Sequence, residues 1–571
     1  MAAPADSCSI TARAREIFAS LFPLLPAEAG PFAEFVTITT SDARDGEPSH
    51  DFPYLPCPFP ETELASALKA LEATMCLLIA SDRFGSEKER KAIIETERAS
   101  LFLLMTYVST VGRRNKHHPQ VREFLKDTDL HRAQSNIYRR LSANIYPTKD
   151  GRYFHLHGSL LSDPSLGMVG LPPYKEELTA YGDVVKVIGD AVKKFTAAEL
   201  EKGAEERKQA GAICLTMGEW AETEQGRIAH SLPPYVLEPV PAASSSGPTP
   251  WPQTDSDKLL SGIKVLELCR IIAGPTIGRT LASYGASVLK ITSPNLSDVP
   301  FFQVDGNAGK RCAELDLKSA EGRKVFEELV KEADVVVDGY RLGALDRLGY
   351  GPEGLGRLLE GRGRGFVYVR ENCYGHVGPW AERAGWQQIA DVSTGVAIAM
   401  GKALGLEGNE PVVPPFPMSD YGTGSLGTIA VLHGLWNRKV HGGNWVGSTS
   451  LAAYDTLLTK QGEYPPAVLD KLFDAHKALG LELVCTDNVD VVSKKSLKTL
   501  KELAPFLFDE GYLIEVPGYG FGTKEARASG RRDVVEECKV VKGTVEFVGV
   551  ETNGEFEEGT RVNGWDEARW W

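Results

Sequence analysis

Between residues 263 and 369, short apolar runs alternate with segments in which apolar residues recur every three or four positions. The runs predict buried strands, and the longer spacing predicts amphipathic helices. Strands are expected at 263–268, 287–291, 313–317, 334–337 and 366–369, and helices at 276–284 and from Ser319 onward, with Ser319 as N-cap. Strands that alternate with single helices indicate an α/β fold built on a Rossmann-like parallel sheet. The first strand is not followed by GxGxxG, and no GxxxxGK[ST] occurs, so neither a dinucleotide fingerprint nor a P-loop is predicted.

The chain divides into segments of unlike character. Residues 238–257, EPVPAASSSGPTPWPQTDSD, are polar and lack periodicity, which predicts a linker. Upstream, residues 60–110 predict two helices around SDRFGSEKER, and YPTKDGRYFHLHG (146–158) predicts a hairpin with an Asp-Gly turn. We therefore expect an N-terminal extension (1–35), a segment 36–237 containing a smaller α+β domain, the linker, a large Rossmann-like domain (258–455) and a C-terminal segment (456–571).

Composition excludes several classes of protein. The formal net charge of -14 disfavours non-specific binding to nucleic acid or membrane surfaces. Between Lys258 and Arg347, however, 13 Lys/Arg stand against 12 Asp/Glu, so this segment is suited to an anionic ligand. The 9 cysteines show no CxxC and indicate free thiols in a reducing compartment. We find no apolar run of about 18 residues and no targeting signal, so we expect a cytoplasmic protein, with a mitochondrial location as the alternative.

Residues 414–427, PPFPMSDYGTGSLG, place a carboxylate between prolines and closely spaced glycines, just before the apolar run 428–432. They predict the start of a helix, and two roles are open for Asp420. In the first, Ser419 and Asp420 cap the helix by accepting hydrogen bonds from its free N–H groups. In the second, Asp420 is a nucleophile that the helix dipole keeps ionised. The glycines lower helix stability unless something approaches the backbone closely, which keeps the second role open.

An upstream segment repeats part of this pattern. Residues 59–63 read FPETE and residues 416–420 read FPMSD, and both precede a long apolar helix, a turn, a short segment and a second helix. The repeat predicts a partial internal duplication in which Glu63 corresponds to Asp420. The upstream part then supplies the back half of a fold and the downstream part its front half, so that Glu63 is expected to be a structural relic.

Four blocks in order resemble the class III CoA-transferases, the CaiB/BaiF family that includes formyl-CoA transferase and α-methylacyl-CoA racemase. The blocks are GIKVLELCRIIAGPTIGRTLASYGASVLKI, GKRCAELDLKSAEGR, ADVVVDGYRLGALDRLGYG and FPMSDYGTG, and NIYPTKDGRYFHLHGSL resembles the family's small-domain segment. The resemblance implies a Rossmann-like large domain with a smaller domain, and two interlocked chains. Here the halves stand in altered order, so a homodimer is one possibility and completion within a single chain is the other.

The resemblance implies a CoA-transferase that moves CoA from an acyl-CoA to a carboxylic acid, with no metal and no tightly bound cofactor. The family's catalytic aspartate corresponds to Asp420, which would form a mixed anhydride and then an aspartyl-CoA thioester. Small neighbours at Gly422 and Gly424 are expected to leave room for the acyl group. The family's CoA contacts correspond to Arg270, Ile272, Ala273, Leu315, Lys318 and Arg347.

Two departures from the family pattern keep other functions open. The usual Asn of "ENFRPG" is Gly339 here, which removes one side-chain contact. The racemase branch uses a histidine in a "GHD" block, where this chain has Trp386, so racemisation lacks its base. The alternatives are therefore a racemase-like isomerase, disfavoured by Trp386, and a non-catalytic acyl-CoA-binding protein.

Histidines and one cysteine suggest other chemistry only weakly. His117-His118 lie in a basic polar stretch and His155-x-His157 alternate along an expected strand, and no third ligand is suitably spaced. Cys373 has no organised base nearby and is expected to be a buried thiol. The sequence therefore predicts no metal site and a single candidate nucleophile.

Overall fold

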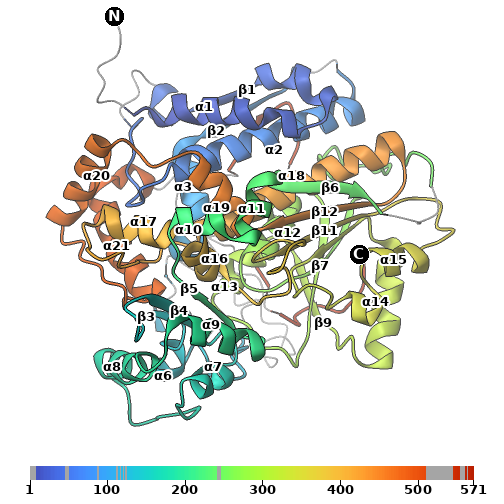
Figure 1. Cartoon of the computed structure of the whole chain (residues 1–571). Helices are drawn as coiled ribbons and strands as arrows, with labels where there is room; N and C mark the ends of the chain where they lie inside the picture. The colour runs from blue at the N-terminus through green and yellow to red at the C-terminus, as the bar shows by residue number, and fades with distance from the viewer. Residues whose placement is uncertain are drawn as a thin grey trace, which may run out of the picture.

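A computed structural model of the chain (Figure 1) describes residues 8–44, 50–86, 89–110, 114–115, 118–119, 121, 125–240, 246–508, 544–552, 560–561 and 563–571. Its largest sheet has seven strands in the order β6-β12-β11-β10-β7-β8-β9. In that order the strands are Tyr235–Pro239, Trp445–Ser450, Val367–Asn372, Val335–Asp338, Lys264–Leu268, Ser287–Thr292 and Arg311–Glu314. Only the edge strand β6 runs antiparallel to its neighbour. The central strands are buried on both faces, as apolar runs in a parallel sheet require.

The α/β prediction is confirmed, and most expected strands agree with the observed ones to within one or two residues. The largest shift concerns the strand expected at 313–317, which is β9 and ends at Glu314. The backbone turns there because the Ser319 N–H donates to the Asp316 carbonyl (3.0 Å). The Ser319 hydroxyl accepts the Gly322 N–H, so Ser319 is the N-cap of the next helix, as predicted.

Helices cover both faces of the large sheet. They are α12 (Ala273–Ser283), α14 (Ala320–Glu332), α15 (Pro352–Leu358) and α18 (Met418–His441), and α13 (Phe302–Gly306) packs against α12. Beyond the sheet lie α16 (Gln387–Thr394), α17 (Val396–Ala403), α19 (Leu451–Lys460), α20 (Pro466–Ala478) and α21 (Val489–Leu503). Helix α18 packs against α12, β11 and β12, which places its first turn at the carboxyl end of the sheet.

The smaller domain, at the lower left of Figure 1, is an antiparallel sheet of β3 (Asn144–Pro147), β4 (Tyr153–His157) and β5 (Ala210–Ile213). It carries α6 (Ile137–Arg140), α7 (Asp163–Met168), α8 (Tyr181–Val192) and α9 (Ala197–Glu206). The predicted hairpin is β3–β4, and its turn has Gly151 at φ 74°, a conformation that favours glycine. The helices α10 (Met217–Glu222) and α11 (Glu224–Ser231) lead back to β6.

Sequence-distant segments meet in a third sheet. Strand β2 (Lys91–Glu95) pairs in parallel with β1 (Val36–Thr39) and antiparallel with β13 (Glu546–Val548). Helix α1 (Ile10–Leu21) packs on α2 (Glu61–Phe84), and α3 (Thr96–Leu103) and α4 (Met105–Val108) follow β2. The expected linker 238–257 begins within β6, and its residues 241–245 lie outside the described part of the chain. Within it, Trp251 is buried, and its indole N–H donates to Asp82 (2.7 Å).

Helix α2 is the one described helix that is long and apolar enough by composition to cross a membrane. Its most apolar window is 94% buried inside the protein, so it serves as a core helix. Helices α2 and α18 pack together, and both have 24 residues. Each starts after a proline (Pro60, φ -77°, ψ 64°; Pro417, φ -78°, ψ 54°) and is followed by a strand and a further helix. This likeness accords with the internal duplication, which remains a prediction.

Candidate active site

The first turn of α18 presents Asp420 without using it as a cap. The N-cap residue is Pro417, and no side chain caps the helix. Ser419 instead donates its hydroxyl to Asp391 of α16 (3.0 Å). The capping role considered for Ser419 and Asp420 is therefore wrong, because the prolines start the helix two residues earlier. Asp420 is the third helical residue and is available for another task.

Burial dominates the electrostatics of Asp420. Its side chain is 8% exposed, and desolvation raises the pKa of its carboxyl to about 8. The expectation that the helix dipole keeps this group ionised is thus corrected, since a dipole effect of about 0.3–1 kcal/mol does not offset burial. A buried carboxyl of this kind becomes a reactive anion at mildly alkaline pH, or when a bound cationic or hydrogen-bonding partner stabilises the charge.

The glycines that follow Asp420 serve helix packing. A Cβ atom at Gly422 would lie 1.9 Å from Cε2 of Tyr454, and one at Gly424 would lie 2.6 Å from Cβ of Thr276. These positions face α19 and α12, so the expectation that Gly422 and Gly424 make room for an acyl group is wrong. Their role is to bring α12 and α19 against α18 and thereby to set the walls of the site.

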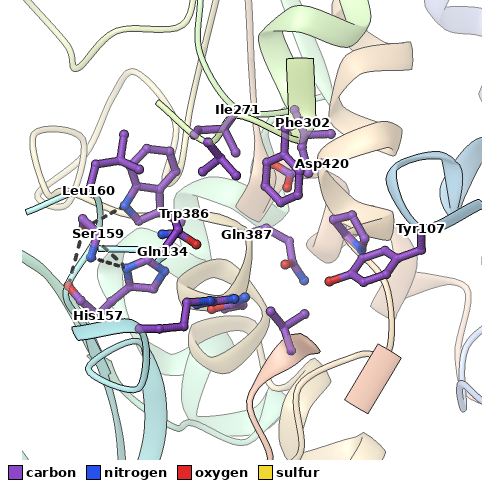
Figure 2. Close-up of a pocket in the computed structure, with 16 residues that line it drawn as sticks. Tyr107, Gln134, His157, Ser159, Leu160, Ile271, Phe302, Trp386, Gln387 and Asp420 are labelled. Carbon is purple, nitrogen blue, oxygen red and sulfur yellow. Dashed lines mark hydrogen bonds between the residues drawn. The ribbon is translucent and has the colours of Figure 1, made fainter. Parts of the chain in front are cut away.

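Asp420 lies where two cavities meet. One has a volume of about 470 Å³ and the other about 90 Å³, and both are lined by Ser159, Leu160, Ile271, Ile272, Trp386 and Asp420. The larger cavity adds the basic residues Arg270, Arg341, Arg347 and Arg383. The smaller one, shown in Figure 2, adds Tyr107, Gln134, Arg140, His157, Val299, Phe302, Gln387, Gln388, Pro417 and Val489. One carboxyl thus faces a broad basic space and a narrow, largely apolar one.

Most residues assigned to CoA binding line the larger cavity. Arg270, Ile272, Ala273 and Arg347 do so, together with Asp420. Leu315 and Lys318 are outside its lining: Leu315 packs partly buried against the sheet core, and Lys318 is exposed. Their segment nevertheless borders the cavity, since the cavity residue Asn295 donates to Asp316 (3.3 Å).

The loop between β7 and α12 is held in a strained shape beside Asp420. Ile271 has φ 74°, which is rare for a β-branched side chain and costs on the order of 1–3 kcal/mol. Arg270 is fixed by a bond from its guanidinium to the Ser297 carbonyl (2.8 Å) and lies over the Tyr340 ring (5.5 Å). The loop thereby brings a cation and the first turn of α12 to the same cavity.

His157 and Ser159 of the smaller domain and Trp386, the N-cap residue of α16, form another wall of the site. The Trp386 indole N–H donates to the Ser159 hydroxyl (2.9 Å), and its ring stacks on His157 (6.1 Å between centroids). The Ser159 N–H donates to Nδ1 of His157 (3.0 Å), and burial lowers the pKa of His157 well below its usual value. A neutral His157 therefore carries its proton on Nε2 and acts as a hydrogen-bond donor.

Sequence reasoning missed a set of buried carboxyls around Asp420. Glu371, at the end of β11, lines the larger cavity, and burial raises its pKa to about 8. Asp391 and Asp455 lie deeper, and burial raises the pKa of both. The charge of Asp455 adds to this effect on Asp391, and the charge of Glu61 adds to it on Asp455. Glu61 accepts the Tyr454 hydroxyl (2.7 Å). The sequence feature that could have revealed Glu371 is its charge at the carboxyl end of a buried strand. No sequence feature marks the deeper acids as part of the site.

Metal and thiol chemistry find little support at this site. His155 and His157 are buried on β4, His118 lies outside both cavity linings, and His117 lies outside the described residues. Within the described part of the chain, Asp42, His50 and Glu97 hold their ligand atoms within 4.8 Å of one another, but none of them lines either cavity. Cys373 lines the larger cavity and is buried, and desolvation raises its pKa well above the usual value.

Replacing Asp420 by asparagine is expected to stabilise the protein increasingly as pH rises. The folded state holds the Asp420 proton up to about pH 8, whereas an unfolded chain releases it near pH 4. Stability therefore falls between these two pH values, and an amide that cannot ionise escapes this loss. We expect the melting temperature of D420N to exceed the wild type by about 2–4 °C at pH 8 and by less at pH 5. Asp470→Asn, on the exposed face of α20, is the control, and an equal difference at both pH values would contradict the burial argument.

A family profile and several known proteins are similar to this chain. The profile of CoA-transferase family III matches residues 260–462. "Acetyl-coenzyme A transferase nodX" of Hypoxylon pulicicidum is 37% identical over 479 residues, which is 81% of this chain and 78% of that protein. An "acyl-CoA transferase" of Gibberella moniliformis is 34% identical over 75% of this chain and 76% of its own length. The crystal structure of the Mycobacterium tuberculosis protein Rv3272 is 28% identical, with a TM-score of 0.31 over 35% of this chain and 57% of its own.

The chain belongs to CoA-transferase family III and is an enzyme of the transferase class. The resemblance inferred from its sequence blocks is thereby confirmed. The two relatives align over three quarters or more of this chain, well beyond residues 260–462. The altered order of the halves stays a prediction.

Proposed function

We propose that the protein moves CoA from an acyl-CoA donor to a carboxylic acid acceptor through covalent intermediates on Asp420. The observation that carries the proposal is the position of Asp420 where a basic cavity and a smaller, largely apolar cavity meet. The larger cavity suits a nucleotide with phosphates, since guanidinium groups bind phosphate in bidentate fashion. The smaller one suits a short acyl group, being smaller than a cavity of about 150 Å³ that binds benzene.

The reaction begins at the Asp420 carboxylate. One of its oxygens attacks the thioester carbonyl, the C–S bond breaks, and CoA leaves with the electron pair, which gives a mixed anhydride. The CoA sulfur then attacks the Asp420 carbonyl carbon and displaces the acyl group as a carboxylate. The acceptor acid repeats both steps in reverse order and restores the free aspartate. The bond energy of the thioester is retained throughout, and no oxidant or reductant is consumed.

The surrounding groups support this chemistry in separate ways. Arg270, Arg341 and Arg347 supply positive charge to the larger cavity, where CoA phosphates would bind. Ala273, the first residue of α12, lines the larger cavity, and its backbone N–H at the positive end of the helix dipole would face developing oxyanions. His157 and Trp386 form a wall of the smaller cavity, and a short acyl donor is in keeping with the relative named acetyl-coenzyme A transferase.

Racemisation receives less support from the site. Trp386 has no basic atom, and the His157 ring accepts the Ser159 N–H at Nδ1, so its other nitrogen carries the proton. A base for removing an α-proton is therefore not provided by either residue. Exchange of the substrate α-hydrogen with D₂O would reverse this assignment.

Intact-mass spectrometry after mixing with a panel of acyl-CoAs tests the proposed intermediate. We expect the wild-type protein to gain a CoA-derived adduct that hydroxylamine removes, because a thioester is cleaved by this nucleophile. Asp420→Ala should form none. Binding of CoA without any adduct from any donor would overturn the transferase mechanism and favour a non-catalytic acyl-CoA-binding protein.

A further inference from the structure

A second carboxyl faces the cavity that contains Asp420. Glu371 is the fifth residue of β11, and its side chain is 8% exposed. It lines the same 470 Å³ cavity as Asp420, and the two carboxyls repel each other through space. The two carboxyls therefore line one cavity and lie near enough for the charge of Asp420 to act on Glu371.

Glu371 is held in place by its surroundings. A Cβ atom at Gly339 would lie 2.7 Å from Oε1 of Glu371, and one at Gly274 would lie 3.2 Å from it. The Gly274 N–H, in the first turn of α12, donates a hydrogen bond to the carboxyl. Because Gly339, which stands where the family pattern has Asn, carries no Cβ, the glutamate carboxyl can lie directly against the backbone at this position. The carboxyl thus has a defined site between the end of β10 and α12.

The neighbours of Glu371 favour its neutral form. Burial first, and then Asp420 and Asp338, raise the pKa of Glu371 to about 8. The other titratable groups that interact with it are the thiols of Cys269 and Cys373, whose own pKa values are raised by burial. A carboxylic acid near neutral pH is a proton donor whose acidity is close to that of a thiol, the match that efficient proton transfer requires.

On the basis of the proposed function, we propose that Glu371 is the general acid and base for the CoA sulfur. As the C–S bond of the donor breaks, the sulfur electron pair takes the proton of Glu371, which leaves CoA as a thiol and Glu371 as a carboxylate. Glu371 then removes that proton while the sulfur attacks the Asp420 anhydride and the acyl carboxylate departs. The proton count is unchanged over the two steps. A free thiolate is thereby avoided in a cavity that already holds two carboxyls.

Single-turnover formation of the Asp420 adduct tests this role with Glu371→Gln. The amide keeps the shape of the side chain and an acceptor for the Gly274 N–H but has no transferable proton. We expect adduct formation to slow by about 10²–10³-fold, with CoA affinity within about twofold of the wild type. The wild-type rate should rise with pH as Asp420 ionises and fall again as the second carboxyl ionises. In E371Q, the rate should no longer fall at high pH, and it should no longer be lower in D₂O than in H₂O.

Two further variants keep the outcome decisive. Gly339→Ala leaves the acid present but displaces it, and should reproduce the loss even if E371Q folds poorly. Glu63→Gln changes another buried acid, whose pKa is raised to about 7, outside both cavity linings, and should react as the wild type does. The role of Glu371 in proton transfer would be overturned if E371Q and G339A both reacted at the wild-type rate. It would also be overturned if E371Q were slow but kept the wild-type pH profile and D₂O effect. Absence of the adduct in the wild type would instead contradict the proposed function.

Discussion

Asp420→Asn is expected to lower CoA transfer by at least about 10³-fold, because the amide cannot form the mixed anhydride and the aspartyl-CoA thioester that the reaction passes through. The side chain keeps its size, and Asp420 makes no capping contact whose loss would disturb α18. CoA binding should therefore persist, since the basic residues of the larger cavity are untouched. Steady-state transfer between an acyl-CoA and a free acid, with CoA affinity measured separately, provides the comparison.

The chain itself supplies a matched control for this variant. Glu63 is the third residue of α2, as Asp420 is of α18, and both helices have 24 residues and follow a proline. Glu63 is fully buried, accepts the Tyr464 hydroxyl (2.9 Å) and lines neither cavity. Glu63→Gln should keep transfer within about twofold of the wild type. Comparable losses in both variants would indicate that Asp420→Asn acts through the fold.

Gly422→Ala is expected to destabilise the protein by at least about 2 kcal/mol, measured by thermal or chemical unfolding. Its Cβ would lie 1.9 Å from Cε2 of Tyr454, a buried ring whose hydroxyl is bonded to Glu61 (2.7 Å). The ring has little freedom to move, so α19 must shift away from α18. The gain of about 1 kcal/mol in helix propensity from Gly to Ala offsets only part of this cost.

Gly427→Ala is the matched control for the packing argument. The nearest atom to its Cβ would be Cδ1 of Ile277 at 2.3 Å, the end of a flexible side chain that can change rotamer. We expect a change of less than about 1 kcal/mol, because the propensity gain and the small adjustment nearly cancel. If G427A destabilised the protein as much as G422A does, the rigidity of the Tyr454 ring would not be the cause of the loss in G422A.

Local patterns were sufficient for much of the fold. The alternation of apolar runs and helical spacing located the strands that became β7, β8, β10 and β11, since each depends on residues adjacent in the chain. The Ser319 cap and the turn at Gly151 likewise depend on a few neighbouring residues. The prolines before α18 marked the start of that helix, although the cap was assigned two residues too late.

The family and the candidate nucleophile also followed from the sequence, because ordered blocks identify Asp420 without coordinates. The tertiary structure decided what surrounds it. Burial sets the pKa of Asp420, and residues from the smaller domain, α12 and α16 enclose the two cavities. The need for glycine at position 422 becomes clear only from its contact with Tyr454, and at position 339 only from its contact with Glu371. The residues of each pair lie 32 positions apart in the chain. Desolvation and close packing depend on which distant segments meet, and a linear pattern of residues does not contain that information.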